Sequence, residues 1–487
     1  MTALETTDRS RWLALYVLCA GALMIVLDAT IVNVALPSIK TDLGFSSSGL
    51  AWVVNAYLIA FGGVLLLAGR LGDLIGQRRV FLAGLAVFTA ASLLCGLAPN
   101  QTMLVIARFV QGLGGALTSA VVLGMIVTMF TEPGERAKAL GVYGFVASAG
   151  GSIGLLAGGV LTSAINWHWI FFINVPVGIV TGILATRLVE NRPGTGIKAG
   201  ADVPGATLLI AGLMLGVYTI LQVTSHGWSS SETLGLGAVS IVLVGAFLVR
   251  QARIANPLMA LRLFRSRNLS GANVIQCLVA AAMFGVFFLG ALYLQQVLGY
   301  DALGVGLAFL PTCVVMGVIS LRYAAPITAR LGVRTTVVTS LSLIAVGLLL
   351  FARTPVDGSY LADVLPPMVL FGAGAGLSFP ALMTLAMSVD SPEDVGLASG
   401  LVNTTVQMGG AIGLSVLATL AAGRTDGQLH QHVAAGTALN SGFHLAYLVA
   451  AALMAAGIVA AAGILRPAAP IVEMEPASVI EPEFATN

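Results

Sequence analysis

The chain has 487 residues, of which 57% are hydrophobic and 9% are charged, whereas soluble domains carry roughly 25% charged residues. This composition excludes a soluble globular protein. The 23 Lys and Arg residues against 21 Asp and Glu residues give a formal net charge of +2, which is no indication of a nucleic-acid partner.

The apolar residues form stretches long enough to cross a bilayer, which takes about 17–25 residues in a helix. Fourteen such stretches follow one another, near residues 13–37, 50–68, 80–98, 103–129, 137–162, 169–189, 203–222, 233–249, 270–296, 303–323, 335–352, 360–386, 396–421 and 443–465. Because backbone polar groups in hydrocarbon must be satisfied within their own segment, we expect helices. The first stretch is too long for the apolar part of a signal peptide. The sequence therefore predicts an all-α integral membrane protein with 14 transmembrane helices and no soluble domain.

Asp28 lies deep inside the first stretch, and no other carboxylate falls at such depth in a predicted helix. An ionisable side chain there is costly, so it is a candidate functional group. Its protonated form costs little in the membrane, whereas its ionised form needs a bound cation or a counter-ion such as Arg108. We therefore predict that Asp28 is a proton site.

Arg108 lies in the fourth stretch and needs a partner too, because its guanidinium group stays charged. Gln111 and Gly112 follow it by three and four residues and share its helix face. We expect Arg108 to tune the protonation of an acid or to order water molecules. The alternative is an arginine that only binds carbonyl groups between helices.

A short basic connection, Gly69–Arg79, joins the second and third stretches. A tight hairpin between two membrane helices needs glycine, and arginines hold such a connection on the cytoplasmic side. An acid there can pair with the arginines or with a helix N-terminus, in a contact that breaks as helices rock. The candidate gating residues are Gly69, Arg70, Asp73, Gly76, Arg78 and Arg79. The alternative is a solvated basic turn.

The fifth stretch carries glycines at four-residue spacing. These are Gly150, Gly154 and Gly158, with Gly159 beside the last. A face of small residues lets helix backbones approach closely. We therefore predict a helix-packing motif here, and plain packing without any transport-specific role is the alternative.

The connection Gly69–Arg79 resembles the loop signature of the major facilitator superfamily. The stretch around Asp28 resembles the first-helix signature of its fourteen-helix drug:proton antiporter branch. Leu104–Gly114, the glycines of the fifth stretch and Asn166–Pro176 resemble further signatures of that branch, so the resemblance covers essentially the whole chain. It implies that Arg108 takes part in proton transfer and that the protein is a drug antiporter. Four positions depart from the branch pattern: Leu74, Leu155, His168 and Val406.

Two connections divide the chain, Glu190–Val203 and Arg250–Asn268. The part before them and the part after them have similar sequence patterns at an offset near 258 residues. The equivalent positions are Gly112 and Gly372, Gly114 and Gly374, Gly76 and Gly332, Arg78 and Arg334, and the segments 131–135 and 390–394. Such a parallel repeat is used by secondary transporters. We predict two six-helix bundles, 12–190 and 269–466, two linker helices within 191–268, and a disordered cytoplasmic tail, 467–487.

Most Lys and Arg residues fall in connections on the same side as both termini, and Lys40, Arg353 and Arg424 fall on the opposite side. Because cytoplasmic loops are rich in Lys and Arg, both termini are predicted to be cytoplasmic. We expect a multi-pass protein of the cell membrane, in a bacterium the inner membrane.

Polar side chains inside the predicted helices outline a candidate substrate cavity. They are Asn33, Asn55, Tyr57, Gln111, Asn273, Gln276, Asn403 and Gln407. Each can instead make a hydrogen bond between helices. A largely apolar cavity with scattered amides suits bulky amphipathic ligands.

These features predict a proton-coupled secondary transporter that exports hydrophobic or amphipathic drugs or antibiotics, including cationic ones, by alternating access. The alternative is a proton symporter or facilitator that takes up a metabolite. No lysine lies in a phosphate-binding loop, so we expect neither an enzyme nor a nucleotide-driven pump. The four cysteines and the pair His430 and His432 lack the number and spacing of metal ligands. The expected partners are a drug-like small molecule, protons and the lipid bilayer, with no cofactor, metal, nucleotide or nucleic acid.

Overall fold

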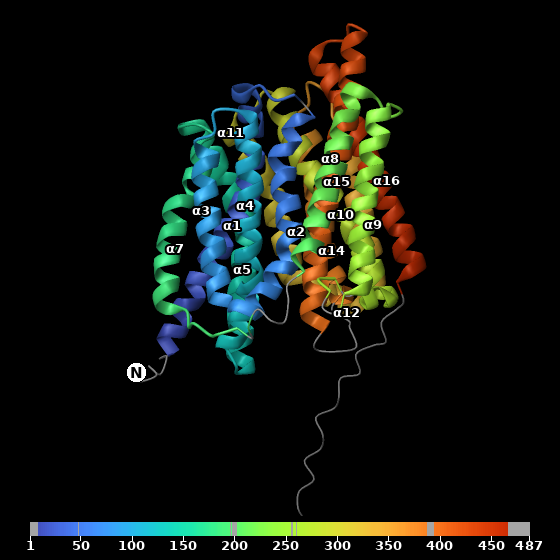
Figure 1. The fold of residues 1–487 in the computed structure, drawn as a ribbon. Helices are drawn as coiled ribbons and strands as arrows, with labels where there is room; N and C mark the ends of the chain where they lie inside the picture. The colour runs from blue at the N-terminus through green and yellow to red at the C-terminus, as the bar shows by residue number, and fades with distance from the viewer. Residues whose placement is uncertain are drawn as a thin grey trace, which may run out of the picture.

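The computed structural model describes residues 8–46, 48–194, 196, 202–254, 257–259, 261–386 and 394–465, and within them the chain is helical, without a strand. The α-helices are α1 (Asp8–Leu43), α2 (Trp52–Ile75), α3 (Gln77–Gly96), α4 (Gln101–Met129), α5 (Pro133–Ala164), α6 (Trp169–Phe172), α7 (Asn174–Leu188), α8 (Val203–His226), α9 (Ser231–Arg253), α10 (Arg267–Gln296), α11 (Ala302–Val318), α12 (Ala324–Leu331), α13 (Val333–Phe351), α14 (Leu365–Ala386), α15 (Asp394–His430) and α16 (Ala435–Ile464). Figure 1 shows the long helices standing side by side, with the N-terminus at one end of the bundle.

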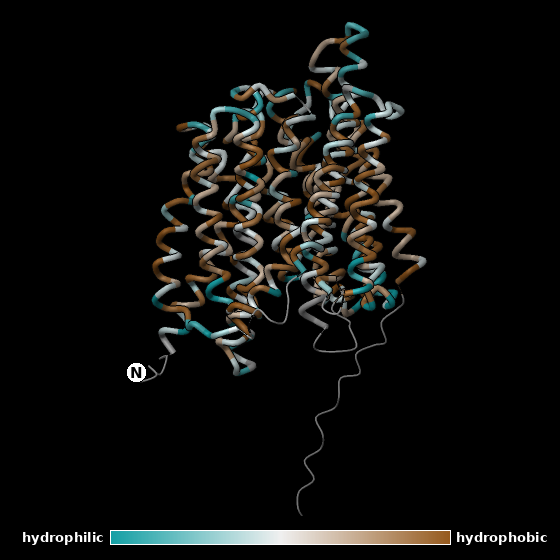
Figure 2. The backbone as a smooth tube through the Cα atoms, in the orientation of Figure 1, coloured by the Kyte–Doolittle hydropathy of each residue, from teal (hydrophilic) through white to brown (hydrophobic). Residues whose placement is uncertain are grey.

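The helices have the length and composition of membrane spans. In the part of the chain that is described, thirteen are long and apolar enough to cross a bilayer. The predicted span 137–162 falls on α5, whose apolar part, Gly150–Ala164, is shorter. The helical membrane fold is therefore confirmed, whereas the number of fourteen stays a prediction. Figure 2 shows apolar residues along the helices and hydrophilic ones toward their ends.

Two spans differ from the prediction. The span 169–189 is split at Ile173 into α6 and α7. Pro176 explains this break, because it has no N–H group to donate to the carbonyl of the residue four positions earlier. The span 303–323 is longer than predicted, because α11 continues through a π-turn, Ile319–Tyr323, into α12.

The prediction that Gly69–Arg79 is a loop was wrong in its extent. Helix α2 continues to Ile75 and α3 begins at Gln77, so Gly76 alone makes the turn. Its φ of 100° lies in the region that glycine adopts without strain. A single glycine is thus sufficient to reverse the chain between the two helices.

Equivalent positions of the predicted repeat make equivalent contacts. Gly112 of α4 lies against a carbonyl of α2, and Gly372 of α14 lies against a carbonyl of α11. Arg78 donates to the carbonyl of Thr186 near the end of α7, and Arg334 donates to a carbonyl near the end of α16. These contacts support the repeat, and the predicted bundle limits stay a prediction. The segment 390–393 and the predicted tail 467–487 lie outside the described residues.

The two predicted bundles meet through a small number of helices. α5 contacts α11, α2 contacts α15, and α8 contacts both α2 and α15. The backbone N–H of Leu303 donates to Ser163 Oγ at 3.1 Å, and Gln295 Nε2 donates to the carbonyl of Val34 at 3.1 Å. These bonds lie at the end of the bundle where α2 begins, so the bundles are in close contact there.

Candidate functional site

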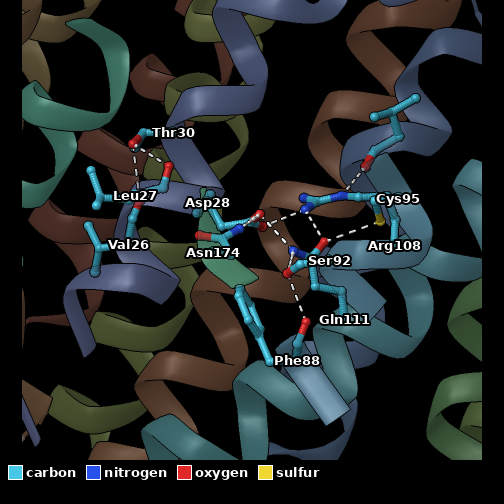
Figure 3. Close-up of polar contacts among 12 residues, drawn as sticks. Val26, Leu27, Asp28, Thr30, Phe88, Ser92, Cys95, Arg108, Gln111 and Asn174 are labelled. Atoms are coloured by element: carbon cyan, nitrogen blue, oxygen red, sulfur yellow. Dashed lines mark hydrogen bonds and ion pairs between the residues drawn. The ribbon is translucent and has the colours of Figure 1, made fainter. Parts of the chain in front are cut away.

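Asp28 is fully buried in the middle of α1 and accepts hydrogen bonds from three side chains. Arg108 Nη1 donates to Oδ2 at 2.5 Å, and Gln111 Nε2 donates to Oδ1 at 2.7 Å. Asn174 Nδ2 donates to Oδ1 at 3.0 Å. Figure 3 shows these groups converging on the carboxylate from α4 and α7. The ionised carboxylate is therefore balanced by one positive charge and two amides.

Arg108 is 1% exposed and has partners other than Asp28. Its Nε donates to the carbonyl of Val53 at 3.0 Å, and its Nη1 donates to Gln111 Oε1 at 2.7 Å. The guanidinium carbon lies 4.4 Å from the centre of the Tyr57 ring, within the range of a cation–π interaction. The charge is thus supported from α2 as well as from α1.

Gln111 connects this ion pair to α3. Its Nε2 also donates to Ser92 Oγ at 2.8 Å, and Cys95 Sγ donates to its Oε1 at 3.6 Å. Ser92 in turn donates to the carbonyl of Phe88 at 2.8 Å. Buried polar groups that are fully bonded in this way are held in one arrangement.

Close helix packing places the pair. Arg108 and Gln111 are three residues apart and share one face of α4. A Cβ at Gly114 would lie 2.8 Å from the carbonyl of Gly84 in α3, and Gly112 lies against the carbonyl of Tyr57 in α2. Side chains larger than hydrogen at these two glycines would force α4 away from its neighbours.

Sequence reasoning brought together Asp28, Arg108 and Gln111 and missed the other partners. Asn174 is an amide at the start of α7, two residues before Pro176, and its polarity in an apolar span was a usable signal. Ser92 and Cys95 carried no signal, because small polar residues are common in membrane helices.

The predicted cavity residues separate into groups. Tyr57 and Gln111 lie at Arg108, whereas Asn55 and Gln407 lie where α2 meets α15. Asn33 donates to two carbonyls of its own helix, those of Ala29 and Thr30.

The remaining cavity candidates lie on α10 and α15. Asn273 accepts from Thr405 Oγ1 at 2.8 Å and donates to the carbonyl of Leu269. Gln276 is buried and Asn403 is exposed. The eight residues therefore do not line one common space in this arrangement.

The predicted gating residues lie around the Gly76 turn, which is covered by the segment after α7. The N–H of Gly196 donates to the carbonyl of Leu74 at 3.0 Å, and a Cβ at Gly76 would lie 2.7 Å from the carbonyl of Arg192. Leu74 is 2% exposed, which gives a packing role to this departure from the branch pattern. Gly69 has open space beside it. Of the charged residues, Arg70 and Arg78 are partly buried and Asp73 and Arg79 are exposed.

The glycines of α5 lie close to neighbouring helices. A Cβ at Gly150 would lie 2.9 Å from Val26 Cγ1, and one at Gly158 would lie 2.7 Å from the carbonyl of Ile31. Gly154 lies against Thr30, which like Val26 and Ile31 belongs to α1. Gly159 instead faces α11, where a Cβ would lie 2.9 Å from the carbonyl of Ala302. These glycines thus place α5 close to α1, which carries Asp28, and close to α11.

A second buried carboxylate, Asp202, lies just before α8. It accepts from Arg250 Nε at 2.6 Å, from Gln251 Nε2 at 2.7 Å and from the N–H of Gly205 at 3.0 Å. Burial by itself raises the pKa of this carboxyl, but the three hydrogen bonds outweigh burial and hold the pKa below its ordinary value. Asp202 therefore ties the start of α8 to the end of α9.

His168 lies between α5 and α6 and is stacked on Trp167 at 3.8 Å. Burial lowers the pKa of His168 below its ordinary value, against the opposing effect of Asp42. Trp167 Nε1 donates to Asp42 Oδ2 at 2.9 Å. His168 thus lies in an aromatic packing contact that includes α1. Across the described residues, no three His, Cys, Asp or Glu side chains are placed to hold a metal ion.

The chain is similar to known transporters over most of its length. Residues 18–414 match the Major Facilitator Superfamily. A puromycin resistance protein of Streptomyces alboniger is 38% identical over 453 residues, which cover 92% of this chain and 90% of that protein. A cephamycin export protein of Amycolatopsis lactamdurans is 39% identical over 418 residues, which cover 85% of this chain and 86% of that protein.

The fold is also found among solved structures. A bacterial homologue of the human lysosomal transporter Spinster, in an inward-facing and unoccupied conformation, has a TM-score of 0.69 at 15% identity, covering 95% of this chain and 100% of that chain. An auto-inhibited peptide transporter of the POT family has a TM-score of 0.68. The family and these relatives are membrane transporters and not enzymes. This chain belongs to the Major Facilitator Superfamily.

Proposed function

We propose that the protein is a proton-coupled antiporter that exports hydrophobic or amphipathic antibiotics or drugs, including cationic ones, by alternating access. Relatives that carry the names of puromycin resistance, cephamycin export and lincomycin resistance proteins support drug efflux as its general activity. The proton coupling is argued from the site itself.

The observation that carries the proposal is the buried pair of Asp28 and Arg108. An ionised Asp28 accepts all three of its hydrogen bonds, and a protonated Asp28 has one oxygen that must donate instead. Arg108 keeps the carbonyl of Val53 and the Tyr57 ring in either case. One proton can therefore be taken up and released without leaving the guanidinium group unsupported.

In this proposal, proton binding changes the contacts between α1 and α4. The neutral acid no longer attracts Arg108, because the Coulomb attraction of the pair requires the carboxylate charge. Deprotonation restores the pair and the original contacts. If proton and substrate compete for the same carboxylate, only one of them is bound at a time. The transporter then carries the proton in one direction and the substrate in the other, which is antiport.

We further propose that both termini are cytoplasmic and that the protein lies in the inner membrane of a bacterium. The clustering of Lys and Arg in connections on the side of the termini supports this orientation. The bonds of Ser163 and Gln295 between the bundles then lie at the outer end. The arrangement described above is accordingly closed toward the outside.

A resistance and dye-efflux panel in a bacterium that lacks its own drug pumps tests this function. We expect expression of the protein to raise resistance to puromycin and to speed ethidium efflux, and a protonophore to abolish both effects. Asp28→Asn should abolish them as well, whereas Asp42→Asn, in the same helix but at its exposed end, should leave them intact. Efflux that survives the protonophore, or accumulation of the drug in energised cells, would contradict the proposal.

A further inference from the structure

Helix α2 carries bonds to the ion pair on one face. The carbonyl of Val53 accepts from Arg108, and Tyr57, one turn later, lies under the guanidinium group. Gly112 of α4 packs closely against the backbone carbonyl of Tyr57. A displacement of Arg108 therefore acts directly on this face of α2.

The opposite face of α2 meets the second bundle. Asn55 Nδ2 donates to Ser415 Oγ of α15 at 2.8 Å, and both side chains are fully buried. Two turns further along α2, a Cβ at Gly62 would lie 2.8 Å from Cβ of Gln407. Leu66 lies next to Gly400, one turn beyond. We call these contacts of α2 residues 55–66 with α15 residues 400–415 the α2–α15 contact.

The α2–α15 contact contains polar atoms that have no partner. Asn55 Oδ1, Thr404 Oγ1 and Gln407 Oε1 are buried without a hydrogen bond to any described residue. An unsatisfied buried polar group costs free energy, which is recovered when water or another partner reaches it. Packing and the bond from Asn55 to Ser415 thus stabilise the contact, whereas these three atoms gain from its opening.

We infer that Asn55 is a positioning residue that transmits the state of the Asp28–Arg108 pair to the second bundle through Ser415. This inference rests on the proposed proton site. While Asp28 is ionised, Arg108 is drawn toward α1 and holds α2 in the position where Asn55 reaches Ser415. When Asp28 is neutral, Arg108 keeps its contacts with α2 but is no longer drawn toward α1. Helix α2 can then move together with Arg108, and the three unsatisfied atoms favour its separation from α15.

The rate at which N-ethylmaleimide labels a cysteine in the α2–α15 contact reports its opening. Thr404→Cys provides the thiol, because Thr404 is 3% exposed and its hydroxyl has no partner. Cys277→Ser removes the native cysteine that is partly accessible, since the other three are buried. The rate is normalised to that of a cysteine at the exposed Thr102.

The parent protein for these measurements carries Thr404→Cys and Cys277→Ser. In this parent, Asn55→Ala and Ser415→Ala should each speed labelling roughly three- to tenfold, the factor that one buried hydrogen bond contributes. The double variant Asn55→Ala/Ser415→Ala should be labelled no faster than either single variant. Ser415→Thr keeps the hydroxyl, so its labelling rate should remain within about twofold of that of the parent. Asp28→Asn mimics the protonated acid and should speed labelling at least about threefold in the parent but less than about twofold in Asn55→Ala. If Asn55→Ala does not fold, Ser415→Ala gives the same comparison.

An effect of Asp28→Asn that has the same size with and without Asn55 or Ser415 overturns the inference, and so does an Asp28→Asn variant that leaves labelling unchanged in the parent. Neither result touches the proposed function, which is tested separately by ethidium efflux under an imposed pH gradient. Gradient-driven efflux that survives Asp28→Asn overturns the proposed function instead. The two failures are thereby distinguished.

Discussion

Removal of Arg108 should destabilise the protein more than removal of Asp28. Arg108→Gln leaves the carboxylate of Asp28 fully buried with only the two amides of Gln111 and Asn174. Breaking a buried ion pair from one side costs about 3–5 kcal/mol. Asp28→Asn should cost less, because Arg108 retains the Val53 carbonyl, Gln111 Oε1 and the Tyr57 ring.

The loss in Arg108→Gln should depend on pH. An isolated buried carboxylate takes up a proton more readily than a paired one, so the variant recovers stability as the pH falls. We expect Arg108→Gln to be about 3–5 kcal/mol less stable than the wild type at pH 8 and to regain part of this difference at pH 5. The double variant Asp28→Asn/Arg108→Gln should be more stable than Arg108→Gln at pH 8, with little pH dependence from this site.

Thermal unfolding of the purified protein in detergent at both pH values measures these differences. Arg322→Gln is the matched control, because Arg322 is an exposed arginine within a span. The reasoning is refuted if Arg108→Gln unfolds at the same temperature as Arg322→Gln. It is refuted equally if the double variant is less stable than Arg108→Gln alone.

Three further predictions concern packing and pH. Gly154→Ala should lower stability by about 1–3 kcal/mol, because its Cβ would enter the contact with α1, whereas Gly141→Ala in the same helix, with open space beside it, should be neutral in the same unfolding assay. Because hydrogen bonds hold the pKa of Asp202 below its ordinary value, the ionised Asp202 stabilises the fold above about pH 4, and this stabilisation is lost as the pH falls below that. The difference in stability between the wild type and Asp202→Asn should therefore be constant from about pH 8 to pH 5 and shrink in stronger acid. Burial lowers the pKa of His168, so its neutral form stabilises the fold above about pH 6.5 and this contribution is lost as the pH falls; His168→Gln should lose less stability than the wild type between pH 7 and pH 5, and equal losses would contradict the assignment.

The helical membrane fold could be predicted because long apolar stretches allow few alternatives in a bilayer. The details that failed depend on single residues. Pro176 breaks a span that hydropathy treats as continuous, and Gly76 completes in one residue a turn that the basic motif suggested was long. Hydropathy averages over windows and does not detect such local features.

The candidate site could be predicted in part for a similar reason. Asp28 and Arg108 stand out because a charge in an apolar helix needs a partner. Asn174 is separated from Asp28 by 146 positions along the chain. A single sequence does not show that α7 packs against α1. The grouping of Asn55 with Ser415 was missed for the same reason, because it requires knowledge of how the two bundles meet.

The claim that Asp28 carries the driving proton is tested most directly with purified protein in proteoliposomes. An imposed pH gradient should drive ethidium transport by the wild type. We predict that Asp28→Asn loses this gradient-driven accumulation while it still exchanges ethidium across the membrane when no gradient is imposed. Accumulation by Asp28→Asn at the wild-type rate would contradict the account.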